Sequence, residues 1–252
     1  MSGETIDVTT PDGVADAYVA RPDGDGRHPG VLLVMDAFGL RPAIERMADR
    51  IAARGYLVLA PNVFYRDART PVVPQELIGD GDRRSELLGK VRPLIGSLTP
   101  DVVARDADAY LGWLEREGRG PVAITGYCMG GRFGWYAAAA YPDRVAALGA
   151  FHTGGLVTDG PDSPHLRAGD LRAELYLGFA DSDASATPEQ VATVDEALDA
   201  AGVRHTTEVY TGALHGYTMA DTPVYDEAAA ERHFDELFAL LERTIGSGAA
   251  VA

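Results

Sequence analysis

The order of apolar and polar positions along the chain predicts strands that alternate with helices. Residues 30–35 form a nearly unbroken apolar run, which is typical of a strand buried on both faces. Residues 42–54 then place apolar side chains at helical spacing, and residues 56–60 form a second apolar run that Pro61 ends. This order of strand, helix and strand predicts a parallel sheet with a crossover helix.

The same alternation continues to the end of the chain. Near the N-terminus, two short strands flank a Thr-Pro-Asp-Gly turn. The strands are expected at 6–9, 15–20, 121–125, 145–151, 175–179 and 206–210, and the further helices at 101–117, 129–140, 188–201 and 225–244. We therefore expect one α/β domain over residues 1–245, with a mostly parallel central sheet and helices on both faces, and a flexible tail over 246–252.

The segment from about residue 64 to residue 99 breaks this regularity. It contains several prolines and glycines together with a group of arginines and a lysine. We expect it to leave the sheet as a long excursion with some helix in it. Insertions of this length in compact domains often carry binding loops.

Charge and composition narrow the function classes. The chain of 252 residues carries a formal net charge of −16, which disfavours nucleic-acid binding because that function needs Lys and Arg to neutralise phosphates. No stretch is apolar enough to predict a membrane span, and the N-terminus lacks the basic and apolar regions of a signal peptide. The single cysteine excludes an intrachain disulfide and is typical of a protein in the reducing cytoplasm.

That single cysteine lies in the most informative motif of the sequence. Gly126-Tyr127-Cys128-Met129-Gly130 has the form of the G-x-S-x-G nucleophile elbow, with sulfur in place of the hydroxyl. The expected strand, sharp turn and helix would expose Cys128 at a helix N-terminus, where the helix dipole favours thiolate. The backbone N–H of Met129 would donate to an oxyanion. The alternative is an inert buried thiol, since cysteine is commonly buried.

Triad partners follow the cysteine in the order that this elbow requires, which is nucleophile, acid and histidine. His215 comes after the last predicted strand and before the last helix, where a catalytic base belongs. Asp181 and Asp183 both follow the strand at 175–179, and spacing alone leaves both open as the acid. His205 and His233 fall at a strand start and inside a helix, and we interpret both as surface histidines.

Other residues fall at the carboxyl ends of predicted strands. Asp36 follows the strand at 30–35, where its carboxylate either faces the nucleophile or only caps a turn. The N–H of Ala37 is the candidate for the second oxyanion donor. His152 either lines the pocket or satisfies its own loop, and Phe38 and Tyr127 are further candidates for the pocket wall.

Taken together, these residues resemble the dienelactone hydrolase family over nearly the whole chain. The resemblance rests on the G-x-C-x-G elbow at 126–130, the acid followed by Phe-Gly at 36–39, the Gly-Tyr-x-x-x-x-Pro at 55–61 and the His-Gly-aromatic at 215–217. It implies an α/β-hydrolase fold with Cys128 as nucleophile, His215 as base and Asp183 as acid. The family has a glutamate at the position of Asp36 that helps ionise the thiol, so Asp36 would be the thiol-activating acid, with a side chain one methylene shorter. The arginines that hold the substrate carboxylate in the family have no match here.

The sequence thus predicts a cysteine hydrolase that cleaves small-molecule esters or lactones through a thioester. No cofactor and no metal are expected, because the chain carries no dinucleotide or P-loop glycine motif and no histidine–carboxylate cluster with ligand spacing. Two rival functions remain: a general esterase or thioesterase on the same scaffold, and a non-catalytic binding protein that kept the fold. The sequence does not give the oligomeric state.

Overall fold

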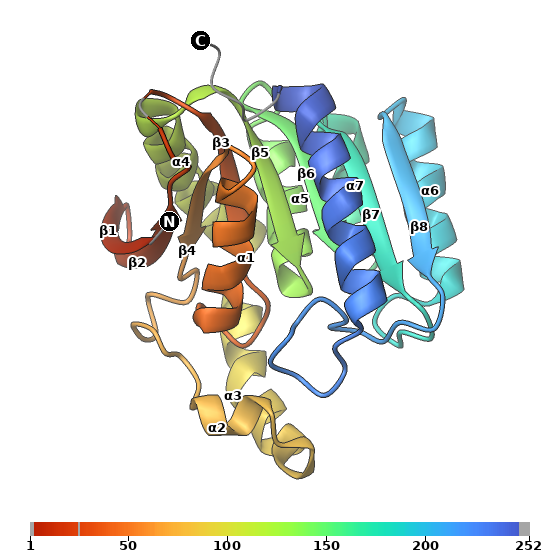
Figure 1. Cartoon of the computed structure of the whole chain (residues 1–252). Coiled ribbons are helices and arrows are strands. Elements are labelled where there is room, and N and C mark those ends of the chain that lie inside the picture. Colours follow the sequence, from red (N-terminus) through yellow and green to blue (C-terminus); the bar gives the residue numbers. More distant parts are fainter. Residues whose placement is uncertain (1–2, 25, 247–252) are drawn as a thin grey trace.

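The computed structural model describes residues 3–24 and 26–246, and eight strands of this part of the chain form one sheet (Figure 1). The strands are β1 (Glu4–Thr10), β2 (Gly13–Ala20), β3 (Pro29–Val34), β4 (Leu57–Pro61), β5 (Arg119–Tyr127), β6 (Val145–Phe151), β7 (Glu174–Ala180) and β8 (His205–Tyr210). Their order in the sheet is β1-β2-β4-β3-β5-β6-β7-β8. Strand β2 is antiparallel to both of its neighbours, and the pairs from β4 to β8 are parallel. The predicted α/β fold class is confirmed.

Helices cover both faces of the sheet. The α-helices are α1 (Pro42–Ala52), α2 (Gln75–Ile78), α3 (Arg84–Ser97), α4 (Pro100–Glu117), α5 (Met129–Ala140), α6 (Pro188–Ala201) and α7 (Glu227–Ile245), and two 3-10 helices span η1 (Gly81–Arg83) and η2 (Pro164–Asp170). Helices α1 and α7 lie on one face, and α4, α5 and α6 lie on the other (Figure 1). Every residue of β3 is buried, as expected for a strand covered on both sides.

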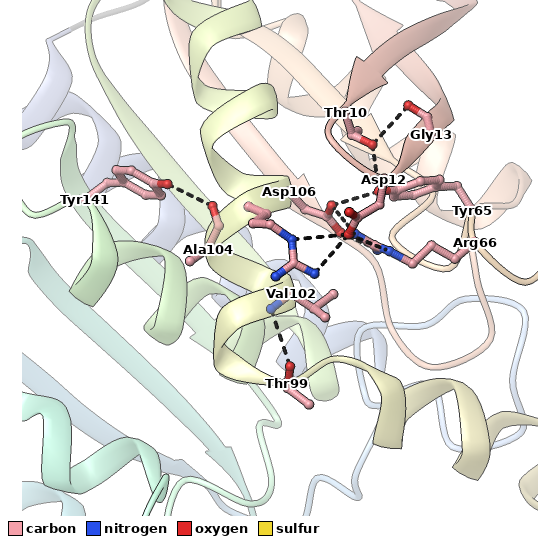
Figure 2. A network of polar contacts seen from close by, with 11 residues as sticks. Thr10, Asp12, Gly13, Tyr65, Arg66, Thr99, Val102, Ala104, Asp106 and Tyr141 are labelled. Atoms are coloured by element: carbon pink, nitrogen blue, oxygen red, sulfur yellow. Dashed lines mark hydrogen bonds and ion pairs between the residues drawn. The ribbon is translucent and has the colours of Figure 1, made fainter.

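Local signals set the ends of these helices. Thr99 accepts a hydrogen bond from the N–H of Val102 and so caps α4, and this contact is drawn in Figure 2. Thr187 and Gln190 form a capping box at the start of α6, and Gly202 ends that helix with a φ of 67°. Asp226 caps α7, so this helix begins at Glu227 rather than at the predicted residue 225.

The irregular segment forms a cap beyond the carboxyl ends of the parallel strands. It contains α2, η1 and α3, which project from the body of the molecule in Figure 1. Pro93 lies inside α3, where it removes one backbone donor from the helix. Because the cap lies beyond the carboxyl ends of the parallel strands, it covers the edge of the sheet where ligands bind in open α/β folds (Figure 1).

A buried carboxylate anchors the start of this segment (Figure 2). Asp106 of α4 is fully buried, and it accepts hydrogen bonds from both terminal nitrogens of Arg66 at 2.6 and 2.8 Å and from the Tyr65 hydroxyl at 2.9 Å. The same hydroxyl accepts a bond from Thr10 at 2.6 Å, and Arg66 also donates to Asp12 at 2.7 Å. This network joins the β1–β2 hairpin, the chain that follows β4 and helix α4, so it fixes the position from which the cap departs.

The interpretation of His233 as a surface residue is wrong. Its side chain is fully buried, with Nε2 3.2 Å from the hydroxyl of Tyr127 and the ring centre 4.6 Å from that of Phe151. Helix α7 packs on β5, β6 and β7, and His233 lies on the packed face.

Of the tail predicted over 246–252, residues 247–252 lie outside the described residues. Across the described residues, no helix is long and apolar enough to cross a membrane.

Candidate active site

Cys128 lies at a sharp turn between β5 and α5. Its backbone has φ 55° and ψ −116°, a conformation that L-residues rarely adopt outside strained functional turns. A Cβ at Gly126 would collide with the backbone of Gly130, and a Cβ at Gly130 would collide with the carbonyl oxygen of Val34. The two glycines of the motif thus let strand and helix approach closely enough to form the turn, which leaves the thiol half-buried.

His215 and Asp183 meet the thiol from the loops that follow β8 and β7. His215 Nε2 lies 3.0 Å from Cys128 Sγ, and His215 Nδ1 lies 2.5 Å from Asp183 Oδ2. The other oxygen of Asp183 accepts hydrogen bonds from the N–H and the hydroxyl of Ser185, at 2.8 and 2.7 Å. Asp181 instead accepts a bond from the N–H of Gly212 at 2.9 Å. Of the two carboxylates that spacing left open, Asp183 is therefore the one that contacts the histidine.

The contact between His215 and Asp183 favours the charged form of both side chains. Burial lowers the pKa of His215, but its hydrogen bonds to Asp183 and Cys128 outweigh burial and raise the pKa to about 10. Burial raises the pKa of Asp183, but the hydrogen bond and the charge of His215 dominate and lower it to about 2. At neutral pH the imidazole is protonated on both nitrogens, so it donates to the carboxylate on one side and to the sulfur on the other.

The backbone N–H groups of Met129 and Ala37 make no hydrogen bond with another described residue. Met129 is the first residue of α5, so its N–H has no acceptor one turn earlier in the helix. The N–H of Ala37 makes no hydrogen bond with the part of the chain that the structure describes. Ala37 lines the same cavity as Cys128, which suits the role of second donor.

Asp36 follows β3 at its carboxyl end, and its carboxylate is held by Arg41, which no motif in the sequence singles out. Arg41 donates to its two oxygens at 2.6 and 3.0 Å and also donates to Asp221 at 2.7 and 3.1 Å. The side chains of Arg41 and Asp36 are only 2% and 5% exposed. Among the described residues, no hydrogen bond joins Asp36 to Cys128. Arg41 therefore ties the loop of Ala37 to the loop that carries His215.

His152 lies beside His215. Its φ is 40°, its Nε2 lies 2.8 Å from the hydroxyl of Thr218, and its ring centre lies 5.4 Å from that of His215. Burial, and then the charge of His215, hold the pKa of His152 well below its usual value, so the ring is neutral. Its Nδ1 is buried without a hydrogen-bond partner among the described residues.

A cavity of about 420 Å³ opens over the sulfur. Cys128, His152 and His215 line its inner end, and Phe38 contributes to one wall. The side chain of Tyr127 is not part of the lining, since it is fully buried and faces His233 in the core.

Helices of the cap supply the outer wall of this cavity. They contribute apolar side chains together with Arg84 and Arg92, which are exposed and make no hydrogen bond or ion pair with another described residue. Over the described ranges, no group of three or more His, Cys, Asp or Glu side chains is arranged to hold a metal.

Comparisons with known proteins agree with this architecture. The model of the dienelactone hydrolase family matches residues 15–245. A protein of Escherichia coli (strain K12) named "putative carboxymethylenebutenolidase" is 32% identical over 221 residues, which cover 85% of this chain and 77% of the relative. The crystal structure of a "putative dienelactone hydrolase" from Klebsiella pneumoniae subsp. pneumoniae MGH 78578 superposes with a TM-score of 0.83 at 27% identity, over 96% of this chain and 98% of the other.

A more distant structure supports the fold alone. The acylaminoacyl peptidase of Pyrococcus horikoshii aligns with a TM-score of 0.67 at 14% identity, over 98% of this chain and 42% of its own.

Proposed function

Since the chain belongs to the dienelactone hydrolase family and is a hydrolase similar to carboxymethylenebutenolidases, we propose that it cleaves small-molecule esters or lactones with Cys128 as the nucleophile. The observation that carries the proposal is the continuous contact from Cys128 Sγ through His215 to Asp183, at 3.0 and 2.5 Å. Sulfur, base and acid come from three different loops at one edge of the sheet, an arrangement that packing alone does not require.

The first half of the reaction forms a thioester. The Cys128 thiolate, stabilised by the imidazolium of His215, attacks the carbonyl carbon of the ester. The N–H groups of Met129 and Ala37 bind the developing oxyanion, an interaction of about 3–4 kcal/mol per donor. His215 then donates its proton to the departing oxygen, so the alcohol or enol leaves and the acyl group stays on the sulfur.

The second half restores the enzyme. Neutral His215 takes a proton from water, and the water oxygen attacks the thioester carbon. The carbon–sulfur bond breaks, the acid leaves and the thiolate is again paired with the imidazolium. Because thiolate is itself a good leaving group, activated esters are the suitable substrates, and we expect little cleavage of amides.

Asp36 has a different role in this proposal from the one that the family resemblance implies. Direct contact with the sulfur would require its carboxylate to give up two short bonds to Arg41. We assign it instead to holding the loop of Ala37 in place, through that buried ion pair.

Dienelactone itself is a second candidate substrate, favoured by one observation. Arg84 and Arg92 line the cavity and have no partner among the described residues, so they are free to meet a substrate carboxylate. The Arg84→Gln/Arg92→Gln double variant should then lose activity on a dienelactone and keep activity on a neutral aryl ester.

The test of the proposal compares wild type with Cys128→Ala and Cys128→Ser on p-nitrophenyl acetate and on a dienelactone. We expect both activities to fall by at least about a thousandfold in Cys128→Ala, as for other triad nucleophiles. Thiol alkylation by iodoacetamide at pH 6 provides an independent check, because a binding protein with an inert thiol would react slowly. Equal rates in wild type and Cys128→Ala would refute the proposal.

A further inference from the structure

We propose that the cavity under the cap binds a long, uncharged, apolar acyl group, so that the preferred substrates are esters of medium-chain or aryl-substituted carboxylic acids. This inference rests on the proposed function and names its substrate class. The apolar side chains that line the cavity above Cys128, several of them from helix α3, support it.

The cap turns an apolar face toward the cavity. Leu87, Leu88, Val91 and Ile95 occupy one side of α3, and all four line the cavity. Leu87 and Val91 are 2% and 0% exposed, so they anchor α3 in the hydrophobic core. Leu88 and Ile95 are only partly buried, so they supply more of the surface that an occupant of the cavity can reach.

The facing wall is also apolar or electrically compensated. Phe38, Met219 and Val224 contribute apolar surface from the loops that carry Ala37 and His215. The carboxylate of Asp36 also lines the cavity, but its charge is neutralised by the bidentate contact with Arg41. Asp80 and Thr222 also line the cavity, but Asp80 accepts a hydrogen bond from the N–H of Asp82, and the hydroxyl of Thr222 donates to the carbonyl of Met219. Most of the surface that an occupant would meet beyond the reacting groups is therefore apolar.

The size of the cavity points to a large group. Its 420 Å³ lies within the range of about 300–1,000 Å³ that is typical of pockets for drug-sized ligands. An acetyl group on Cys128 would leave most of that space empty. A longer apolar chain would fill it and bury its methylenes against the side chains of α3.

The acyl side of the ester is the side that gains from this surface. The acyl group stays attached to Cys128 through both chemical steps, whereas the alcohol departs after the first. Contacts with the acyl group are therefore present in both transition states, and those in the acylation transition state increase kcat/KM. Arg84 and Arg92 are exposed, so an ion pair with a substrate carboxylate would contribute little in water, whereas their aliphatic stems extend the apolar wall. An uncharged acyl group and a carboxylate-bearing substrate are therefore alternatives for this cavity, and the half-ester below separates them.

A series of p-nitrophenyl esters tests this inference, because the leaving group stays constant while the acyl chain lengthens from acetyl to dodecanoyl. We expect kcat/KM to rise about two- to fourfold per added methylene until the cavity is filled, as expected for burial of methylene groups. Hexanoyl should also exceed the adipic half-ester, which has the same chain length and a terminal carboxylate.

A cavity-filling variant adds a site-specific readout. Leu88→Trp on the cavity side of α3 should lower the ratio of kcat/KM for the octanoyl ester to kcat/KM for the acetyl ester by about tenfold or more. Lys90→Trp is the matched control, since Lys90 is exposed on the same helix and does not line the cavity. Ile95→Trp serves as a second filler if Leu88→Trp does not fold.

The outcomes separate this inference from the proposed function. A flat chain-length series, or a preference for the adipic half-ester, combined with Cys128-dependent acetate hydrolysis overturns the inference and leaves the proposed function standing. Hydrolysis of every ester at the same rate by wild type and Cys128→Ala overturns the proposed function itself. A rise with chain length that Leu88→Trp abolishes and Lys90→Trp preserves supports the inference.

Discussion

Substitution of Arg41 by glutamine should be among the most damaging single changes in this protein. The guanidinium is 2% exposed and donates to two carboxylates, one on each of the two loops that border the sulfur. Loss of its charge leaves Asp36, only 5% exposed, without a counter-ion. Breaking a buried ion pair in this way costs about 3–5 kcal/mol of the free energy of unfolding. For a domain of this size, that corresponds to a fall in Tm of roughly 6–20 °C.

Thermal and urea unfolding measures this effect in five proteins, which are wild type, Arg41→Gln, Asp36→Asn, the double variant of these two changes, and Arg167→Gln. Arg167→Gln is the control, because Arg167 and Asp170 form an ion pair in which both side chains are nearly half exposed, and its loss should cost less than about 1 kcal/mol. Asp36→Asn combined with Arg41→Gln should be more stable than the sum of the single changes predicts, by at least about 1 kcal/mol, since the asparagine leaves no unpaired charge at position 36.

Activity should fall together with stability. Arg41 joins the loop of Ala37 to the loop of His215, so Arg41→Gln should lower kcat even at temperatures where the variant is fully folded. An Arg41→Gln protein that is as stable as Arg167→Gln would refute the reasoning, because it would mean that the buried charges at Asp36 and Asp221 do not depend on their common partner.

Three further predictions follow from the site. The stability difference between wild type and His215→Asn, measured as Tm against pH, should be largest between about pH 4 and 6.5. The raised pKa of His215 stabilises the fold below pH 6.5, and this stabilisation is lost as the pH rises toward about 10, while the lowered pKa of Asp183 stabilises the fold above pH 3.8, and this stabilisation is lost as the pH falls toward about 2. A constant difference from pH 4 to 10 would contradict this prediction. Gly130→Ala should abolish folding or activity, since its methyl group would collide with the carbonyl oxygen of Val34, and unaltered kcat and Tm would count against the close approach. Asp183→Asn should lower kcat by about 10³–10⁴-fold while Asp181→Asn stays within about tenfold, a ratio that would reverse if Asp181 were the acid.

Much of the fold follows from local patterns in the sequence. The buried strands appear as apolar runs, and the helices expected at 101–117 and 188–201 agree with α4 and α6 to within one residue at each end. The candidate nucleophile, acid and base could also be predicted from the sequence, because chain order and the glycines of the elbow restrict the positions that these residues can occupy.

The rest depends on contacts between distant parts of the chain. Arg41 and Asp221 are separated by 180 positions, and no local pattern pairs them. The choice between Asp181 and Asp183 is decided by which carboxylate the loop of His215 reaches. His233 lies next to charged residues in sequence, so only the packing of α7 on the sheet reveals that it is buried.

The sequence also did not predict which side chains of the cap line the cavity. The apolar positions of α3 are interrupted by Pro93 and are divided between the core and the cavity, so their pattern along the sequence is weak.

The most direct test of the central claim is to trap the acyl group on the sulfur. Wild-type protein is mixed with excess p-nitrophenyl octanoate, quenched in acid within the first turnover, and examined by intact and peptide mass spectrometry. The account predicts one octanoyl group per chain, located on the peptide that contains Cys128, and no adduct in Cys128→Ala. Turnover of the ester with the acyl group on another residue, or in Cys128→Ala at the wild-type rate, would contradict it.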